Sequence, residues 1–100
     1  MYVVMTRVKL IPGTSEQCAE LFRKTNPELV SEEKDWLGAR MIFDNETNII
    51  TVIATWRDVE SYKAMSASQK FQRTMQEFGK FFASAPDIST NDVLVDMVQK

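Results

Sequence analysis

"NIITVIATWRDVESYKAM", residues Asn48 to Met65, is the stretch that decides the fold, because it predicts a strand followed directly by a capped helix. The two faces of the predicted strand are both largely apolar, with Ile50, Val52, Ala54 and Trp56 on one and Ile49, Thr51, Ile53 and Thr55 on the other. A strand without a distinctly polar face is expected to be covered on both sides. Asp58 then suits the N-cap of a short helix that carries Tyr62.

The N-terminal third predicts a strand and then a helix. Tyr2 to Leu10 is rich in β-branched residues and stops at a Pro-Gly turn. Thr14 or Ser15 is expected to cap a helix, whose apolar side carries Cys18, Leu21, Phe22 and Leu29. Proline disfavours helix in the residue before it, so Pro27 predicts a kink or a restart with Asn26 as the new N-cap.

The rest of the chain predicts a hairpin, a second helix and a last strand. "WLGARMIFD" (residues 36–44) is expected to place Leu37, Ala39, Met41 and Phe43 on one face, before a turn at "DNETN" (Asp44 to Asn48). Ser66 to Ser68 should separate the short helix from a longer one, whose apolar stripe is Phe71, Met75, Phe78 and Phe82. After Pro86, "NDVLVDMV" (Asn91 to Val98) is expected to form the last strand, apolar on both sides.

This order of elements, βαββαβ, predicts an α+β, ferredoxin-like domain spanning residues 1–100, with a four-stranded antiparallel sheet and helices on one face. The helices suffice to cover only that face. An apolar sheet face left open would exceed the patch that a soluble monomer usually exposes. We therefore expect a homodimer in which two sheets pack face to face into an α/β barrel, with room for a small apolar or aromatic ligand.

Composition excludes several functions. The chain has 12 Lys and Arg against 14 Asp and Glu, a net charge of −2 without blocks of one sign, so nucleic acid is not an expected partner. No stretch approaches the ~20 apolar residues of a membrane span, and Met1 leads straight into a strand rather than a cleavable leader. We expect no membrane association and a cytoplasmic location.

Missing residue types narrow the chemistry further. The chain contains no histidine, which removes the usual general base, haem ligand and zinc ligand. Its single cysteine, Cys18, lies at helical spacing with Leu21 and Phe22, so buried packing is favoured over a reactive thiol. The three glycines are far apart and form no phosphate-binding loop. No metal site and no cofactor are expected.

The chain resembles the antibiotic biosynthesis monooxygenase family of dimeric α/β-barrel proteins. The resemblance runs from Val3 to Val98 and is carried by "VVMTRVKLIPGTSEQCAELFRK", "WLGARMIFD" and "TVIATWRDVESYKAMSASQKFQRTM". Its most recognisable element is a tryptophan ending a strand, an acidic helix start, an aromatic residue and a phenylalanine, here Trp56, Asp58, Tyr62 and Phe71. Members of this family differ in function.

Two branches of the family suggest different site residues. Members that oxidise anthrone-like phenols with dioxygen and no cofactor line the pocket with Asn, Trp and Tyr in the spacing N-x3-W-x5-Y. Trp56 and Tyr62 match this pattern, but Val52 stands at the Asn position and cannot replace the amide. The haem-degrading branch uses Asn, Trp and His where this chain has Thr6, Met65 and Met75, so haem degradation by that mechanism is not expected.

The resemblance implies a cofactor-independent monooxygenase acting on a small quinol or anthrone-like aromatic. Trp56 would stack on the ring and Tyr62 would donate a hydrogen bond to its oxygen, as the catalytic pair. Arg7 or Arg73, if directed inward, would hold the anionic substrate, with Thr6 as a weaker contact and Val52 in the pocket wall. The alternative is a non-catalytic dimeric module that binds a small ligand or has a regulatory or stress-related role.

Each of these residues also has a purely structural interpretation. For Trp56, core or dimer packing is favoured over a catalytic role, and Tyr62 is equally typical of a half-buried tyrosine that satisfies its hydroxyl locally. Arg7 suits a salt bridge to an acidic residue of the last strand, such as Asp96. Arg73 suits a solvent-exposed helix position.

Overall fold

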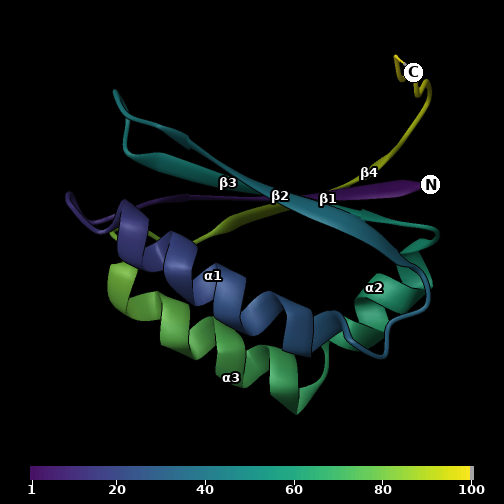
Figure 1. Cartoon of the computed structure of the whole chain (residues 1–100), viewed down its shortest axis with the longest axis horizontal. Coiled ribbons are helices and arrows are strands. Elements are labelled where there is room, and N and C mark those ends of the chain that lie inside the picture. The colour runs from purple at the N-terminus through teal and green to yellow at the C-terminus, as the bar shows by residue number, and fades with distance from the viewer. Residues whose placement is uncertain (100) are drawn as a thin grey trace.

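A computed structural model describes residues 1–99 and shows a four-stranded antiparallel sheet with three α-helices (Figure 1). The strands are β1 (Tyr2–Lys9), β2 (Trp36–Asp44), β3 (Ile49–Trp56) and β4 (Asp87–Asp92). The helices are α1 (Ser15–Val30), α2 (Val59–Ser66) and α3 (Gln69–Phe78), the last continued by the 3₁₀ turn η1 (Gly79–Phe81). The sheet order β2-β3-β1-β4 is that of a ferredoxin-like α+β fold, which confirms the predicted class.

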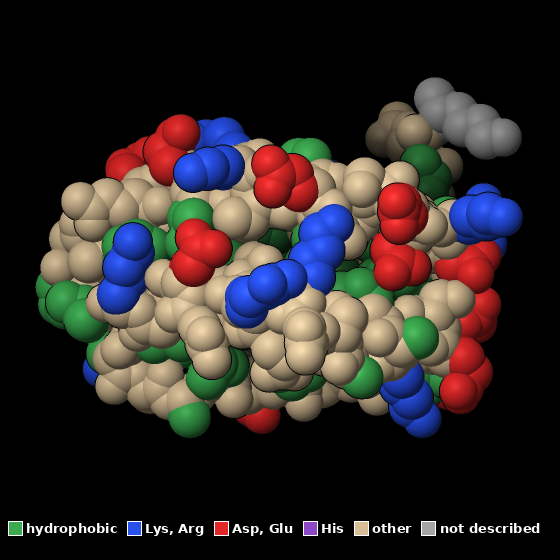
Figure 2. All heavy atoms as spheres, turned by 90° about the horizontal axis from the view of Figure 1, so that it is seen from below, with side chains coloured by type: hydrophobic (Ala, Val, Ile, Leu, Met, Phe, Trp, Pro, Cys, Tyr) green, Lys and Arg blue, Asp and Glu red, His purple; other side chains and the backbone are tan. Residues whose placement is uncertain are grey.

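The helices form one layer against one face of the sheet. In Figure 1 α1, α2 and α3 all lie below the strands, and no helix within residues 1–99 covers the upper face. We call this second surface the open face. Seen from the helix side, Figure 2 shows Lys, Arg, Asp and Glu side chains scattered with both signs mixed, as expected for a solvated surface.

Strand register assigns each side chain to one of the two faces. β1 pairs antiparallel with β3, so that Val4 lies opposite Ala54, and Val8 opposite Ile50. These four residues point toward the helices and belong to the core or its margin. Because side chains alternate along a strand, the residues between them, including Ile53, belong to the open face.

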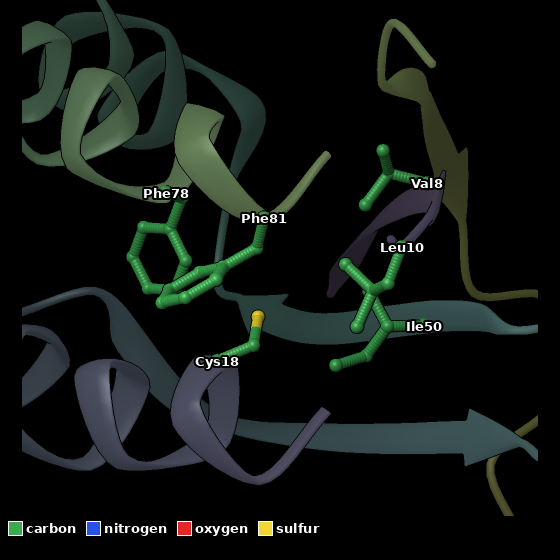
Figure 3. Close-up of a cluster of buried hydrophobic side chains, with 6 residues drawn as sticks. All are labelled: Val8, Leu10, Cys18, Ile50, Phe78 and Phe81. Carbon is green, nitrogen blue, oxygen red and sulfur yellow. The ribbon is translucent and has the colours of Figure 1, made fainter. Parts of the chain in front are cut away.

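One core cluster lies between the sheet and the ends of α1 and α3 (Figure 3). Its buried members come from strands and helices that are far apart in the sequence: Val8, Leu10, Cys18, Ile50, Phe78 and Phe81. The predicted core role of Cys18 is confirmed, since its thiol is buried and burial raises its pKa. A second cluster, around Val4, Trp56 and Met65, lies near α2.

Helix capping largely follows the sequence. Asp58 accepts a hydrogen bond from the Ser61 backbone N–H at 2.8 Å and caps α2, as predicted. Ser68 caps α3 in the same way through the Phe71 N–H, so the break at residues 66–68 is also confirmed. Thr14 precedes α1 but makes no capping bond, because its hydroxyl donates to the Ile11 carbonyl instead.

The prediction of a restart at Pro27 is wrong. Helix α1 runs without interruption from Ser15 to Val30 and contains Pro27 in its last turn. Proline there removes a single hydrogen bond, the one to the Arg23 carbonyl. Burial of Cys18 on one side of this position and Val30 on the other holds the helix together across it. Asn26 is therefore a helical residue and not a cap.

The expected face of Leu37 is also wrong. The β2–β3 register shifts between Trp36 and Gly38, which is a β-bulge. A bulge inserts one residue and reverses the alternation locally. Ala39, Met41 and Phe43 keep the helix-facing side, but Leu37 is left exposed.

The last strand lies earlier than predicted. β4 spans Asp87–Asp92, is fully exposed along its length and is polar, whereas the apolar residues of the predicted strand 91–98 mostly follow it. The reason is the length of β1: Tyr2 pairs with Asp92, and the Val93 N–H bonds to the Met1 carbonyl, so no partner strand remains beyond this point. Arg7 consequently lies opposite Asp87 and not beside Asp96.

No helix within residues 1–99 combines the length and the apolar character needed to cross a membrane.

Replacing Leu10 tests the core. Leu10 is 1% exposed, so Leu10→Ala leaves a cavity and should lower the free energy of unfolding by about 2–5 kcal/mol in urea denaturation. The neighbouring Ile11 is 42% exposed and provides a matched control. Ile11→Ala should cost less than about 1 kcal/mol. Equal losses for the two variants would contradict this description of the core.

Candidate functional site

A cavity of about 110 Å³ lies between the helix-facing side of the sheet and the three helices. Its wall is mostly aliphatic, aromatic and methionine side chains from β1, β3, α1, α2 and α3. A small cavity lined mainly by apolar side chains with a few polar groups is typical of a small-molecule site. The sequence-predicted residues Thr6, Val52, Trp56 and Tyr62 all line it.

Polar groups in this wall are few and uncharged. The hydroxyl, amide and indole groups come from Thr6, Thr25, Asn26, Tyr62, Thr74, Trp36 and Trp56. No Asp, Glu, Lys or Arg of the part of the chain that the structure describes lines the cavity. The site is therefore built to bind through hydrogen bonds and ring contacts, without a charged group of its own.

Trp56 is the best-defined functional candidate. It ends β3, where it lies opposite both Tyr2 of β1 and Trp36 of β2, and it is 1% exposed. Its indole Nε1–H is buried and has no hydrogen-bond partner among the described residues. A buried donor left unsatisfied costs about 1–3 kcal/mol, and most such groups in folded proteins are paired. An acceptor on a bound molecule would supply the missing partner.

Tyr62 is held against Trp56 by the start of α2. The Asp58 cap fixes the first turn of this helix, and the Ser61 hydroxyl donates to the Asp35 carboxylate at 2.7 Å, which ties the turn to the beginning of β2. The two rings meet edge to face, with centroids 5.9 Å apart and an interplanar angle of 65°. The predicted pair of Trp56 and Tyr62 is thus in direct contact.

Burial raises the pKa of Tyr62 above its ordinary value of 10.0, and an interaction with the Ser66 side chain opposes this to a smaller extent. With a pKa above 10.0, the phenol is protonated at neutral pH. Tyr62 is therefore available as a hydrogen-bond donor and not as a base.

Thr6 and Val52 face each other across the β1–β3 pair and line the cavity together. Thr6 brings a hydroxyl to the wall, and Val52 brings only methyl groups. Val52 therefore supplies no amide to the sheet side of this cavity.

Neither predicted arginine reaches the cavity. Arg7 follows Thr6 in β1, so alternation turns it to the open face, where it borders a separate depression with Ile42 and Thr51. Arg73 is exposed on α3 and does not line the cavity. Their expected contact with an anionic substrate is not supported by this arrangement.

Sequence reasoning missed the contribution of the helices to the polar wall. Asn26 of α1 and Thr74 of α3 both line the cavity. The signal for Asn26 was its spacing, four residues after Phe22 and four before the buried Val30, which places it on the sheet-facing stripe of a continuous helix. The expected restart at Pro27 concealed it.

The family comparison identifies the class of protein. The profile of the antibiotic biosynthesis monooxygenase family matches residues 1–77. The chain belongs to this family. No match was found among curated proteins.

Solved structures share the fold at low sequence identity. A protein assigned to the antibiotic biosynthesis monooxygenases from Bordetella bronchiseptica superimposes with a TM-score of 0.82 at 17% identity, covering 94% of this chain and 97% of that one. One of the same description from Caulobacter crescentus gives 0.81 at 17% identity, with 94% and 90% covered. A mutant of SnoaB, a cofactor-independent oxygenase from Streptomyces nogalater, gives 0.80 at 11% identity, with 98% and 97% covered.

The environment of Tyr62 predicts a late tyrosine titration. Because burial raises its pKa, the folded state favours the neutral phenol; this contribution to stability is present below pH 10 and is lost as the pH rises through the raised pKa. The ultraviolet difference between wild type and Tyr62→Phe should show phenolate from this residue only above pH 10. In denaturant the same difference should appear near pH 10. Ionisation of Tyr62 below pH 10 in the folded protein would contradict its burial.

Proposed function

We propose that this protein is a cofactor-independent monooxygenase that oxidises a small phenolic ring with dioxygen. The observation that carries the proposal is the contact between the rings of Trp56 and Tyr62 in the wall of a small apolar cavity, with the buried Trp56 N–H left without a partner among the described residues. Family membership and the fold shared with a cofactor-independent oxygenase support it.

The proposed reaction is balanced without any added reductant. A phenolate passes one electron to dioxygen, the two radicals combine at a ring carbon, and the resulting hydroperoxide loses water to leave a carbonyl. One oxygen atom ends in the quinone and the other in water, and the phenol itself supplies all four electrons. An anthrone follows the same balance, its CH₂ group becoming a carbonyl.

The protein's part in this scheme is binding, hydrogen bonding and exclusion of water. Trp56 and Tyr62 present two donors that would stabilise negative charge on the ring oxygen. No basic side chain within residues 1–99 lines the cavity, so the bound phenol gives up its proton to water before it passes an electron to dioxygen. The scheme therefore requires a phenol or quinol that ionises readily.

The second candidate is a non-catalytic module that binds a small ligand in the same cavity, in a regulatory or stress-related role. Val52 and the uncharged wall favour it, because neither a sheet-side amide nor a cation is available to hold an anion. Both candidates predict ligand binding, and they differ only in turnover.

Oxygen uptake separates the two candidates. We expect the wild-type protein to accelerate oxygen consumption with at least one of a benzenoid quinol, a naphthoquinol and an anthrone, relative to the same solution without protein. Trp56→Phe and Tyr62→Phe should each lower the rate by about tenfold, because each removes one hydrogen bond to the developing anion.

Tyr2→Phe is the matched control for this experiment. Tyr2 packs near Trp56 but does not line the cavity, so loss of its hydroxyl should leave the rate within about twofold of wild type. A rate that no substrate raises above the protein-free control would exclude the oxygenase and leave the binding module.

We also propose that two copies of the chain pair through the open face. The centre of this face carries Val3, Met5 and Ile53, and Ile42 beside them is 47% exposed. Arg7 of β1 lies opposite Asp87 of β4 on the same face. Such a combination of apolar and oppositely charged side chains suits a twofold interface, in which each copy presents the same surface.

The C-terminal segment after β4 supports this assembly. Residues 93–99 form no strand, and Leu94 and Met97 are 92% and 85% exposed. In Figure 1 the C-terminus stands on the side of the sheet away from the helices, so the segment projects from the open face. A second copy seated on that face would cover these side chains, which a monomer leaves in water.

Ile53→Lys should break the dimer. A lysine at the centre of the interface would be buried without a partner and should weaken association by roughly a hundredfold or more. Sedimentation should show wild type at twice the 11.5 kDa mass of one chain and the variant at one chain mass. Truncation after Val93 should shift the same equilibrium toward the monomer.

Gln76→Lys adds the same charge on the exposed side of α3 and should leave the mass unchanged. A wild-type protein that sediments as a folded monomer at micromolar concentration would overturn the proposed assembly.

A further inference from the structure

We infer that Asn26 is a specificity-determining residue, and that together with the Trp56 N–H it selects a single aromatic ring that bears oxygen. The ligand class inferred here is that of the proposed function, and the inference rests on that function for the location of the site. It does not require that the protein turns the ligand over. It depends on which polar groups of the wall are already satisfied and on the size of the cavity.

The indole of Trp56 sets one requirement for the ligand. An indole Nε1–H donates and cannot accept, so only an acceptor on the ligand satisfies it. This group is buried and unpartnered in a residue that is 1% exposed. A hydrocarbon ring would fill the same space and leave the donor unsatisfied. Where a ligand oxygen reaches this N–H, an oxygen-bearing ring is favoured over a hydrocarbon of the same shape.

Several other polar groups of the wall are already occupied. The Thr25 hydroxyl donates to the Leu21 carbonyl at 2.8 Å, and the Thr74 hydroxyl donates to the Lys70 carbonyl at 2.9 Å. Both bonds stay within the residues' own helices. These two hydroxyls are thus not free donors for a ligand.

Asn26 differs from its neighbours in this respect. It is half-buried on the sheet-facing stripe of α1 and lines the cavity, and its side-chain amide makes no hydrogen bond to another described residue. An amide both accepts and donates. It can accept from the O–H of a phenol and donate to the carbonyl of the corresponding quinone, without a charge in either case. Asn26 therefore suits substrate and product alike.

The cavity size limits the ligand to one ring. A cavity of about 150 Å³ in another protein accommodates benzene. The cavity here is smaller, about 110 Å³, which favours a single ring over the three rings of an anthrone. A monocyclic phenol or quinol is the ligand class that the geometry favours.

A pair of ligands with the same shape tests this inference directly. p-Cresol and p-xylene differ only by a hydroxyl in place of a methyl group. Calorimetry should show that Asn26→Leu lowers the affinity for p-cresol by about tenfold, because one hydrogen bond in a buried site is lost. The affinity for p-xylene should stay within about twofold of wild type. Thr25→Val is the matched control on the same helix and should leave the preference unchanged, because its hydroxyl already bonds to Leu21.

Nuclear magnetic resonance provides a second readout at Trp56. The indole N–H resonance should move downfield when p-cresol binds and stay in place with p-xylene, and Trp36→Phe assigns it because the chain has two tryptophans. If Asn26→Leu does not fold, Asn26→Ala serves for the same comparison.

The outcomes are distinct. The inference would be overturned by any of three results. These are a wild type that fails to bind p-cresol, an Asn26→Leu variant that binds p-cresol with unchanged affinity, and an Asn26→Leu variant that loses affinity equally for both ligands. A lost preference for p-cresol in Asn26→Leu without any oxygen uptake by wild type would support the inference and refute the oxygenase. Oxygen uptake by wild type, together with an unchanged preference for p-cresol in Asn26→Leu, would support the oxygenase and refute the inference about Asn26.

Discussion

The antiparallel pairing of β1 with β3 is the constraint on which the rest of the structure depends. Its register sets Thr6 opposite Val52 and Tyr2 opposite Trp56, on the side that the helices cover. A slip of one residue would turn the cavity wall to the open face and bring Arg7 into the core. The alternation of one strand pair thus decides which residues line the cavity and which lie on the open face.

The cavity combines an apolar wall with a small number of neutral polar groups, and this balance defines its chemistry. The buried Trp56 N–H has no partner among the described residues, and a buried donor of this kind generally costs about 1–3 kcal/mol unless an acceptor reaches it. Tyr62, with its raised pKa, adds a second neutral donor. Such a site stabilises charge that develops during a reaction better than it binds a preformed anion.

Periodicity and capping signals predicted most of the fold, and the errors have physical causes. Asp58 and the apolar alternation of residues 49–56 located α2 and β3 because both are local signals. Leu37 was misplaced because a bulge depends on pairing with β3, and β4 because its extent is set by where β1 ends. The family resemblance singled out Trp56 and Tyr62, but their contact and the position of Asn26 in the cavity wall depend on tertiary packing that tolerates Pro27 inside α1.

The two faces of the sheet also separate the two proposed properties of the protein. Residues that line the cavity and residues of the open face alternate along the same strands, so a substitution such as Ile53→Lys changes the open face without altering the cavity wall. Thr6 and Arg7 are neighbours in sequence and lie on opposite faces for the same reason. Ligand specificity and pairing can therefore diverge independently within this fold, which is consistent with a family whose shared architecture persists at 11–17% identity among the structural relatives described above.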